Sequence, residues 1–215
     1  MKGGVVLLHG LARRGGSMSR LAAAARRDGY ATCSPTYPGR RRSIADLVAF
    51  LAPTFAAFEA SCGGPVSIVT HSLGGLLARA LIRVHRPKQL GRVVMLAPPN
   101  AGSEVADLIY RVRLDRVILG PAGIHLRTGR NEDAERLLGP IDFELGVIAG
   151  DRALDPIFPR LIFSRPNDGK VAVAATHVAG MADHIVLPVS HPLMMYDRRV
   201  VMQTMAFLNT GRFRR

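Results

Sequence analysis

Short apolar runs alternate with amphipathic stretches along most of the chain. Several runs are apolar at almost every position, a pattern that is typical of strands covered on both faces of a parallel sheet. Strands are predicted at six places: residues 4–8, 30–36, 66–70, 92–96, 143–149 and 184–189. Between the strands, apolar residues three and four positions apart indicate helices. Helices are predicted at residues 17–27, 43–60, 74–84 and 198–208.

The alternation of strands and helices predicts an α/β domain with a doubly wound, mainly parallel sheet. This rhythm is broken over residues 100–140, which combine short helical patterns with Gly-Pro pairs at 120–121 and 139–140. An irregular stretch of this length inside a compact domain is often a lid or a binding loop. We therefore predict a single domain over residues 1–215 that carries a small cap-like insertion at about 100–140.

The composition adds a strong positive charge to this picture. The 215 residues are 48% hydrophobic and 21% charged, as in soluble globular proteins, and the net charge is +13. No nucleic-acid-binding motif is present, and four Tyr and no Trp leave little for base stacking, so no nucleic-acid partner is expected. The charge is interpreted as a solvated, arginine-rich surface. Peripheral contact with an anionic membrane surface is the weaker alternative.

The chain as given carries no predicted membrane span or export signal. No apolar run reaches the roughly 18 residues that cross a bilayer, and the apolar stretch after the N-terminus is interrupted by His9. A cytoplasmic location is therefore expected, although a removed leader would permit secretion.

The segment around Ser72 carries the first candidate chemistry. An apolar strand runs into Thr70-His71-Ser72, and good helix formers follow Gly74 and Gly75. A serine at the tip of a sharp strand–helix turn is the geometry of a nucleophile elbow, where the flanking residues must be small because strand and helix nearly touch. Gly74 meets that demand, whereas Thr70 stands where the G-x-S-x-G pattern has its first Gly. An ordinary strand–helix turn is the alternative interpretation.

A serine hydroxyl needs a general base within hydrogen-bond reach, and the base needs a group that orients it. Of the seven histidines, His191 lies in a loop just past the last predicted strand, at the sheet edge where α/β sites assemble. His191 is therefore the predicted base. His9 and His71 lie too close in sequence to the ends of their own strands to reach the Ser72 hydroxyl as a base. We expect His9 to hold its loop and His71 to pack beside Ser72.

Four sequence features, taken in chain order, carry a family resemblance. They are an apolar strand followed by His9-Gly10-Leu11, then Thr70-His71-Ser72-Leu73-Gly74-Gly75, then Pro166-Asn167-Asp168-Gly169, and then Ser190-His191-Pro192. Over essentially the whole chain this order resembles the α/β-hydrolase superfamily, in particular its small bacterial lipases and esterases. The resemblance implies a compact six-stranded sheet, Ser72 as nucleophile, His191 as base and an acid on a loop after the penultimate strand.

Several aspartates could supply the acid. Asp168 matches the Asn-Asp-Gly turn that carries the acid in many lipases, and it is the favoured candidate. Asp155 follows the strand that ends near residue 149 more closely, where other members of the superfamily place theirs. Asp183 is a further alternative, and Asp168 can also be interpreted as part of an ordinary turn.

The resemblance also implies an oxyanion hole and a substrate pocket. The backbone N–H groups of Leu11 and Leu73 are expected to bind the oxyanion. An apolar site for the acyl group of a neutral ester is expected from the insertion and from the loop after the base. Its candidate residues are Val105, Leu108, Ile109, Val117, Ile118 and Leu119 in the insertion, and Leu193, Met194 and Met195 after His191. The alternative is that these side chains only pack the insertion onto the body.

Together, these features predict a serine carboxylic-ester hydrolase, of esterase or lipase type, that acts through an acyl-enzyme on Ser72. Its expected partner is a small-molecule ester or lipid. A thioesterase or an acyltransferase would use the same residues, and a non-catalytic protein of this fold would only bind its ligand. No cofactor or metal is expected, because the triad supplies its own base. Cys33 and Cys62 are also too few for a disulfide framework and lack metal-ligand spacing.

Overall fold

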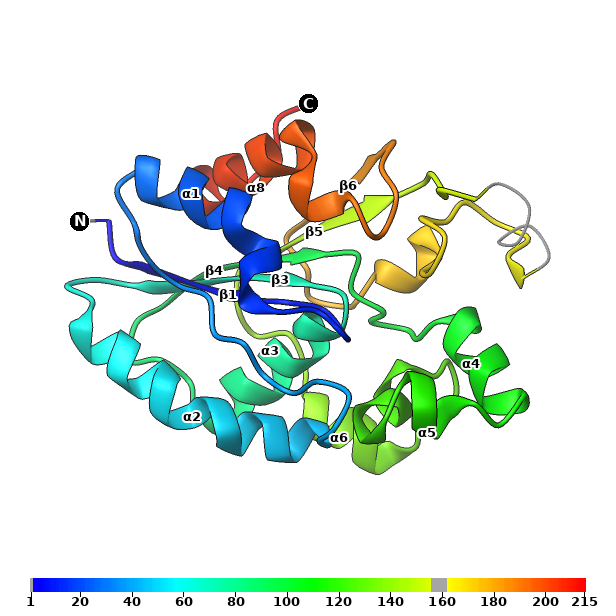
Figure 1. Cartoon of the computed structure of the whole chain (residues 1–215). Helices are drawn as coiled ribbons and strands as arrows, with labels where there is room; N and C mark the ends of the chain where they lie inside the picture. Colours follow the sequence, from blue (N-terminus) through cyan, green and yellow to red (C-terminus); the bar gives the residue numbers. More distant parts are fainter. Residues whose placement is uncertain (1, 156–161) are drawn as a thin grey trace.

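The computed structural model describes residues 2–155 and 162–215, which build a six-stranded sheet (Figure 1). The strands are β1 (Gly4–Leu8), β2 (Ala31–Cys33), β3 (Val66–His71), β4 (Leu90–Leu96), β5 (Leu145–Gly150) and β6 (Asp183–Leu187). All neighbouring strands pair in parallel, in the order β2-β1-β3-β4-β5-β6. The predicted doubly wound parallel sheet is confirmed.

Helices cover both faces of the sheet. They are α1 (Ser19–Arg27), α2 (Ile44–Ser61), α3 (Leu73–Val84) and α8 (Arg198–Thr210). α1 and α8 lie on one face, and α2 and α3 lie on the other (Figure 1). Side chains of the central strands alternate between the two layers: Val6 and Ile68 join the core under α2 and α3, whereas Val5 and Val69 join the core under α1 and α8. Burial on both faces explains why these strands are apolar at nearly every position.

α2 begins at a capping box. The Ser43 hydroxyl accepts a hydrogen bond from the Asp46 N–H, and the Asp46 carboxylate accepts one from the Ser43 N–H. The apolar face of α2, which includes Leu47, Leu51 and Phe55, is buried in the core. By length and composition α2 alone among the described helices could cross a membrane, but core helices of soluble proteins pass the same test. In this fold α2 packs against α3 and β1.

Two strands end earlier than the sequence predicts. β2 spans only three residues of the predicted 30–36, and Pro35 follows soon after its end. The chain then turns, so that the Gly15 N–H donates to the Thr36 hydroxyl at 3.0 Å. β6 ends directly before Pro188 rather than at residue 189. A proline has no N–H to donate and therefore tends to end a ladder.

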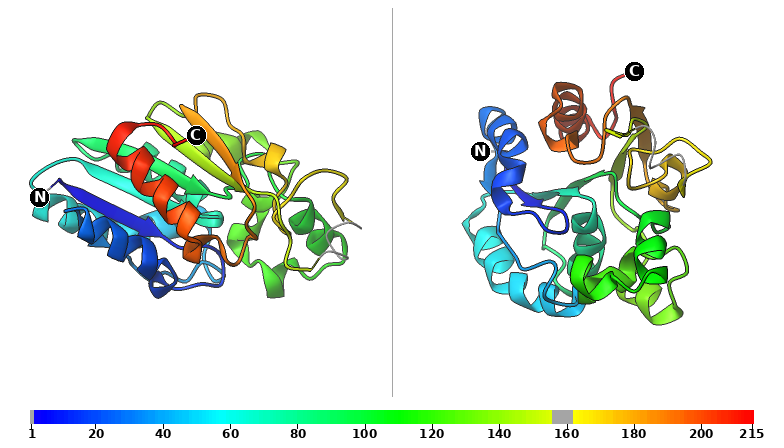
Figure 2. Two further views of the ribbon diagram at one scale, coloured as in Figure 1. Left: turned by 90° about the horizontal axis from the view of Figure 1, so that it is seen from above. Right: turned by 45° about the vertical axis from the view of Figure 1, so that its right-hand side comes forward.

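Residues 100–140 form a helical insertion between β4 and β5, beside the carboxyl end of the sheet (Figure 2). Its elements are α4 (Glu104–Arg111), α5 (Asp115–Ile118), a 3-10 helix (Pro121–Leu126) and α6 (Glu132–Leu138). Side-chain caps begin two of these helices: Ser103 accepts from the Ala106 N–H, and Asn131 accepts from the Ala134 N–H. The insertion therefore stands next to the edge where the functional candidates gather.

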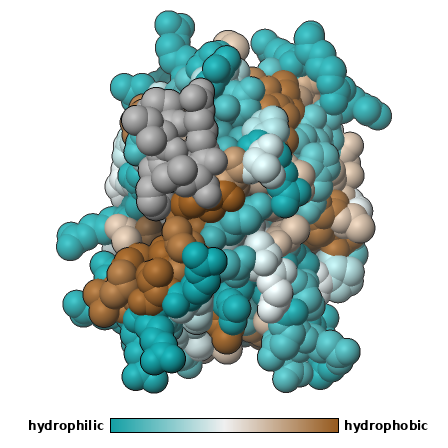
Figure 3. Space-filling view, turned by 90° about the vertical axis from the view of Figure 1, so that its right-hand side faces the viewer, coloured by the Kyte–Doolittle hydropathy of each residue, from teal (hydrophilic) through white to brown (hydrophobic). Residues whose placement is uncertain are grey.

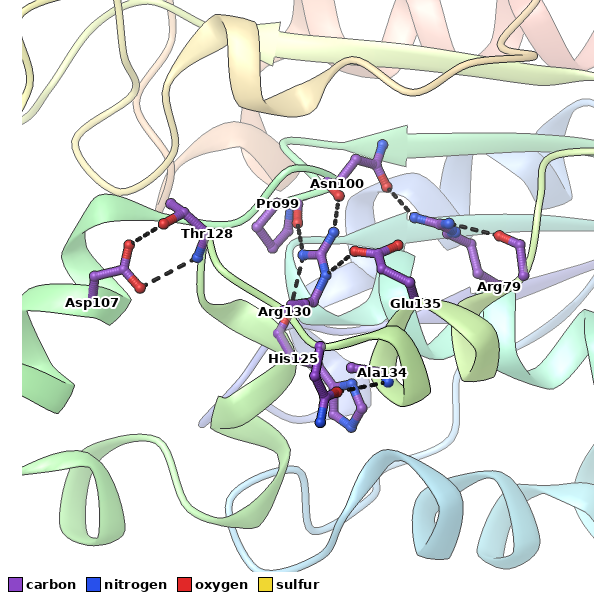
Figure 4. Close-up of polar contacts among 11 residues, drawn as sticks. Arg79, Pro99, Asn100, Asp107, His125, Thr128, Arg130, Ala134 and Glu135 are labelled. Carbon is purple, nitrogen blue, oxygen red and sulfur yellow. Dashed lines mark hydrogen bonds and ion pairs between the residues drawn. The ribbon is translucent and has the colours of Figure 1, made fainter.

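Arg130 ties this insertion to the end of β4 (Figure 4). Its side chain is only 4% exposed and forms an ion pair with Glu135 at 2.5 Å. It also donates to the backbone carbonyls of Pro99, Asn100 and His125. A buried guanidinium is tolerated only when its donors are paired, so these carbonyls stabilise the arginine as much as it fixes them.

Arg79 of α3 supports the same segment from the sheet side. It donates to the Asn100 side-chain oxygen at 3.4 Å and to the Gly139 carbonyl at 2.6 Å (Figure 4). The Asn100 side-chain N–H in turn donates to the Thr176 carbonyl at 2.8 Å. The loop that follows β4 is therefore held by α3, by the insertion and by the segment before β6.

Candidate active site

Ser72 lies at a sharp turn between β3 and α3. Its backbone has φ 53° and ψ −122°, a left-handed conformation that is strained for a residue with a side chain. The turn is fixed at both ends, because the Ser72 N–H donates to the Leu96 carbonyl at 2.9 Å and the Gly75 N–H donates to the Ser72 carbonyl at 2.8 Å. This is the geometry of the predicted elbow, and Ser72 lines a cavity.

Gly74 and Gly75, which follow Ser72 in the turn and helix, each lie close to a different neighbouring segment. A Cβ on Gly74 would lie 2.5 Å from the Leu8 carbonyl oxygen, so no side chain fits there without moving backbone. A Cβ on Gly75 would lie 3.4 Å from the Thr70 hydroxyl and 3.0 Å from Pro98. Thr70, which departs from the G-x-S-x-G pattern, is therefore accommodated where Gly75 leaves room.

His191 and Asp168 form a buried pair. The His191 ring Nδ1 lies 2.7 Å from Asp168 Oδ2, and the His191 backbone N–H donates to the Asp168 carbonyl at 2.9 Å. Asp168 Oδ1 accepts from the N–H groups of Lys170 and Val171, at 2.9 and 2.8 Å. The Asp168 side chain is 1% exposed, and its two oxygens hold three donors, which compensates a carboxylate removed from water.

The other two candidate acids lie elsewhere. Asp155 is exposed. Asp183 opens β6 and so lies at the amino end of its strand, the opposite edge of the sheet from His191. There it accepts from the N–H of Phe213 and from the guanidinium of Arg215, and it fastens the end of the chain. The structure brings Asp168 to His191.

Ser72 and His191 line one cavity of about 190 Å³. Its apolar wall comes largely from the insertion: Val105, Ala106, Ile109, Ile118, Leu119 and Leu126. Of the residues expected at the acyl site, four line this cavity: Val105, Ile109, Ile118 and Leu119. Five do not: Leu108, Val117, Leu193, Met194 and Met195. The cavity-facing side of α4 is centred between Ala106 and Ile109, which turns Leu108 away. Met194 is fully buried in the core under α1 and α8.

The backbone of Gly10 passes close to the nucleophile. A Cβ there would lie 2.8 Å from His71 Nδ1 and 3.3 Å from the Ser72 Cβ. Leu11 follows in the cavity wall, and Leu73 directly follows Ser72. Within the described part of the chain, neither the Leu11 N–H nor the Leu73 N–H has a hydrogen-bond acceptor. Two donors that lack acceptors beside a serine are the arrangement that can hold an oxyanion.

The sequence model of the Alpha/beta hydrolase family matches residues 5–207, which include the elbow, Asp168 and His191. The chain belongs to the alpha/beta hydrolase family. The resemblance drawn from the order of its motifs is confirmed. No curated protein sequence matches this hydrolase.

Solved structures share the fold of this hydrolase at low sequence identity. A lipase of Bacillus licheniformis in its mature form aligns with a TM-score of 0.73 at 20% identity, over 98% of this chain and 92% of the lipase. A metagenomic carboxyl esterase aligns with a TM-score of 0.69 at 21% identity, over 87% of this chain and 64% of the esterase. The pyrethroid hydrolase PytH aligns with a TM-score of 0.64 at 16% identity, over 98% of each chain. At these identities the likeness shows the fold alone.

His9 of this hydrolase braces the loop that carries Gly10. Its Nε2 accepts from the Tyr37 N–H at 3.2 Å, so its Nδ1 carries the proton and donates to the Gly10 carbonyl at 2.8 Å. Tyr37 stacks on the ring at 3.8 Å and donates its hydroxyl to the His9 carbonyl. Burial lowers the pKa of His9, which favours the neutral ring.

His71 supports the base from behind. Its Nε2 lies 3.1 Å from the His191 carbonyl, and the two rings are 4.7 Å apart. Burial, followed by the neighbouring His191 and Arg13, holds the pKa of His71 well below its usual value. The ring of His71 is therefore neutral near pH 7.

Two cations in the cavity wall were not named from the sequence. They are Arg13, three residues beyond Gly10, and Lys170, two residues beyond Asp168. Their closeness to motif residues was the available signal, but a chain with 29 basic residues offers many such neighbours. Ala106 and Leu126 were also missed, because the helical pattern of the insertion does not say which face of each helix turns toward the serine.

Proposed function

We propose that this protein is a serine carboxylic-ester hydrolase, of esterase or lipase type, that acts through an acyl-enzyme on Ser72. The observation that carries the proposal is that His191, which is paired with the buried Asp168, lines the same cavity as the strained Ser72. With Nδ1–H donating to Asp168, the His191 Nε2 presents a lone pair that can take the Ser72 proton. A structural turn would need neither the strain nor the buried pair.

The reaction follows from these positions. Ser72 Oγ attacks the ester carbonyl carbon while its proton passes to His191. The oxyanion accepts hydrogen bonds from the Leu11 and Leu73 N–H groups. His191 then gives the proton to the departing alcohol oxygen as the C–O bond breaks, and the acyl group stays on Ser72. A water molecule gives a proton to His191, attacks the acyl carbonyl and releases the acid, and Ser72 regains its proton.

The apolar wall supplied by the insertion supports an ester with a hydrophobic acyl group as substrate. The lipase, the carboxyl esterase and the pyrethroid hydrolase that share the fold are in accord with an ester-hydrolysing chemistry. A thioesterase or an acyltransferase would share every step up to the acyl-enzyme. These activities differ only in the leaving group and in the acceptor that replaces water.

The test is a panel of p-nitrophenyl esters of increasing acyl length, run on the wild type and on Ser72→Ala. We expect wild-type turnover that falls by at least about 10⁴-fold in the variant, because the nucleophile is gone. Ser61→Ala, at the exposed end of α2, is the matched control and should keep the wild-type rate. A fluorophosphonate probe should label the wild type and not Ser72→Ala.

Two results would contradict the proposal. One is a wild type that hydrolyses no ester and resists the fluorophosphonate. The other is a Ser72→Ala variant that retains the wild-type rate. Either would favour a protein of this fold that binds its ligand without catalysis.

A further inference from the structure

The rim of the candidate site carries two cations that belong to different loops. Arg13 follows β1 and Lys170 precedes β6, and both line the cavity together with Ser72 and His191. Arg13 is half-buried and Lys170 is exposed. Within the described residues neither cation forms an ion pair with a carboxylate. The cavity mouth is therefore flanked by two positive charges that no acidic side chain compensates.

Both cations are anchored to the turns that carry the site. The Arg13 N–H donates to the Gly10 carbonyl at 3.2 Å, and its guanidinium donates to the Pro192 carbonyl at 3.1 Å, next to His191. The Lys170 N–H donates to Asp168 Oδ1 at 2.9 Å. Their placement distinguishes these two cations from the many basic side chains elsewhere on the molecule.

The acidic groups nearby are already paired. Asp168 is held by His191 and by two backbone N–H groups. Glu104, at the start of α4, forms an ion pair with Arg165 at 3.1 Å. Both cations also contribute to the lowered pKa of the buried His71 beside the serine, behind the larger effect of burial. Their charges therefore reach the place where a substrate would react.

We propose that Arg13 and Lys170 select esters that carry an anionic group, a carboxylate or a phosphate, near the scissile bond. This inference rests on the proposed ester hydrolysis and narrows its substrate class. It replaces the neutral ester expected from the apolar residues alone: the apolar wall takes the hydrophobic part, and the cationic rim takes the charge. An exposed ion pair changes affinity by up to about fivefold, so the two cations together should favour the anion by up to about 25-fold.

The experiment compares anionic esters with neutral partners of the same shape. Leaving-group charge is tested with 4-butyryloxy-3-nitrobenzoate against 4-butyryloxy-3-nitrobenzamide. Acyl-group charge is tested with the mono-p-nitrophenyl ester of glutaric acid against p-nitrophenyl pentanoate. Each kcat/KM is divided by the rate of hydroxide hydrolysis of the same ester, which removes intrinsic differences in reactivity. The pair that shows the preference tells on which side of the ester the anion lies.

Variants assign the preference to the two cations. We expect the anionic-to-neutral ratio to fall about fivefold in Lys170→Met and to fall further in Lys170→Glu. Arg13→Gln should lower it as well, while its amide can still donate to the Pro192 carbonyl. Lys88→Met removes an equal charge from an exposed loop before β4, at the opposite edge of the sheet, and should leave the ratio unchanged. In the wild type the anionic-to-neutral ratio should fall when the salt concentration is raised from about 20 mM to about 500 mM, because salt screens exposed charges.

The outcomes separate this inference from the proposed function. Turnover of the neutral esters with no anionic preference in either pair overturns the selectivity and leaves ester hydrolysis standing. A preference that persists unchanged in Lys170→Glu and Arg13→Gln also overturns it. Failure to hydrolyse any of the four esters, with no fluorophosphonate labelling, overturns both.

Discussion

Single residues determine how closely the backbone can approach Ser72. Gly74 and Gly10 both occupy points where a Cβ would collide with fixed atoms of a neighbouring segment. The strained Ser72 backbone is held between hydrogen bonds to β4 and to the first turn of α3. The elbow is therefore a product of packing, because the left-handed conformation of a serine persists only when its surroundings impose it.

Gly74→Ala should destabilise the protein and reduce its activity. The added Cβ would lie 2.5 Å from the Leu8 carbonyl oxygen and 2.9 Å from that of His9, so the strand and the helix must separate. We expect a loss of about 1–3 kcal/mol in the free energy of unfolding, measured with urea. Gly63→Ala is the control, since nothing lies within 4 Å of its added Cβ. Equal stability of the two variants would mean that the elbow does not depend on this contact.

Asp168→Asn tests which aspartate orients the base. The amide would favour the wrong tautomer of His191, so we expect kcat on a p-nitrophenyl ester to fall by about 10³–10⁴-fold. Asp155→Asn and Asp183→Asn should retain kcat within a few fold, because Asp155 is exposed and Asp183 lies at the opposite end of β6 from His191. If Asp183→Asn or Asp155→Asn showed the larger loss, the acid would have been assigned to the wrong loop.

Motif residues could be located from the sequence because their chemistry fixes both residue type and spacing. Ser72, Asp168 and His191 each lie in a short turn sequence. Their order along the chain was enough to predict that they lie at the same edge of the sheet. Met194 could not be placed in this way. Three residues past His191, it follows a turn whose direction depends on tertiary packing, and it enters the core instead of the cavity.

At the scale of elements, the contact between the insertion and the sheet is made by polar groups rather than by apolar packing alone. Arg130, which sequence reasoning passed over, satisfies carbonyls of the β4 loop and of the 3-10 helix (Figure 4). No local pattern marks it, because its partners are backbone oxygens supplied by distant turns. Pro99, one of those partners, lines the cavity, so this contact also shapes the site.

Arg130→Met should loosen the insertion. The change removes the buried guanidinium that pairs with Glu135 and leaves three backbone carbonyls without a hydrogen-bond donor. We therefore expect a loss of about 2–4 kcal/mol in the free energy of unfolding. KM for an ester substrate should rise more than kcat falls, because the cavity wall moves while the base and the nucleophile stay in place. Arg136→Met is the control: its ion pairs with Glu132 and Asp133 are exposed, and the expected loss is about 0.5 kcal/mol or less. Similar losses in both variants would argue against a buried clamp.

The edge strand β6 should make stability sensitive to acid. Burial, and then the charge of the stacked His177, lowers the pKa of His184 to about 4, although Asp183 acts in the opposite direction. The unfolded chain then binds the extra proton at higher pH than the folded chain. The stability that a neutral His184 contributes is therefore present above about pH 6.5 and is lost as the pH falls toward 4.

His184→Gln should flatten this acid response. We expect the free energy of unfolding of the variant to fall less between pH 6.5 and about 4 than that of the wild type, as measured by urea titration at several pH values. His85→Gln, an exposed position at the end of α3, should follow the wild type. Parallel curves for all three proteins would show that His184 titrates alike in the folded and unfolded chain.

For the whole molecule, the apolar pattern was enough to predict the layers and the parallel sheet, because burial on both faces leaves few polar positions in the strands. The ends of β2 and β6 were predicted less well, since the ladder stops near prolines whose effect depends on the neighbouring strand. The surface of the insertion was the least predictable part. Its side chains face the body, the cavity or solvent according to packing that no period in the sequence describes.

The surface of the insertion, together with the net charge of +13, predicts binding to an anionic membrane surface. Large apolar side chains are exposed along residues 112–124 of the insertion: Val112, Leu114, Val117, Ile118 and Ile124. Figure 3 shows apolar atoms gathered on the side of the molecule where α4 and α5 lie. In the described chain, Arg111, Arg113 and Arg116 beside them have no carboxylate partner. Apolar groups flanked by unpaired arginines suit an anionic lipid surface, to which each cation adds about 1 kcal/mol.

We therefore expect the protein to sediment with vesicles of phosphatidylglycerol and phosphatidylcholine, and much less with phosphatidylcholine alone. Binding should weaken as salt rises, because the attraction to a charged surface is screened within about 10 Å. Val117→Ser, at a side chain that is 69% exposed, should reduce binding without affecting the free energy of unfolding. Met202→Ser alters an apolar side chain that is 57% exposed on α8, far from the insertion, and should bind as the wild type does. If the two variants bound vesicles equally well, the apolar side chains of the insertion would not contribute to binding. The attraction would then come from the positive charge of the surface as a whole.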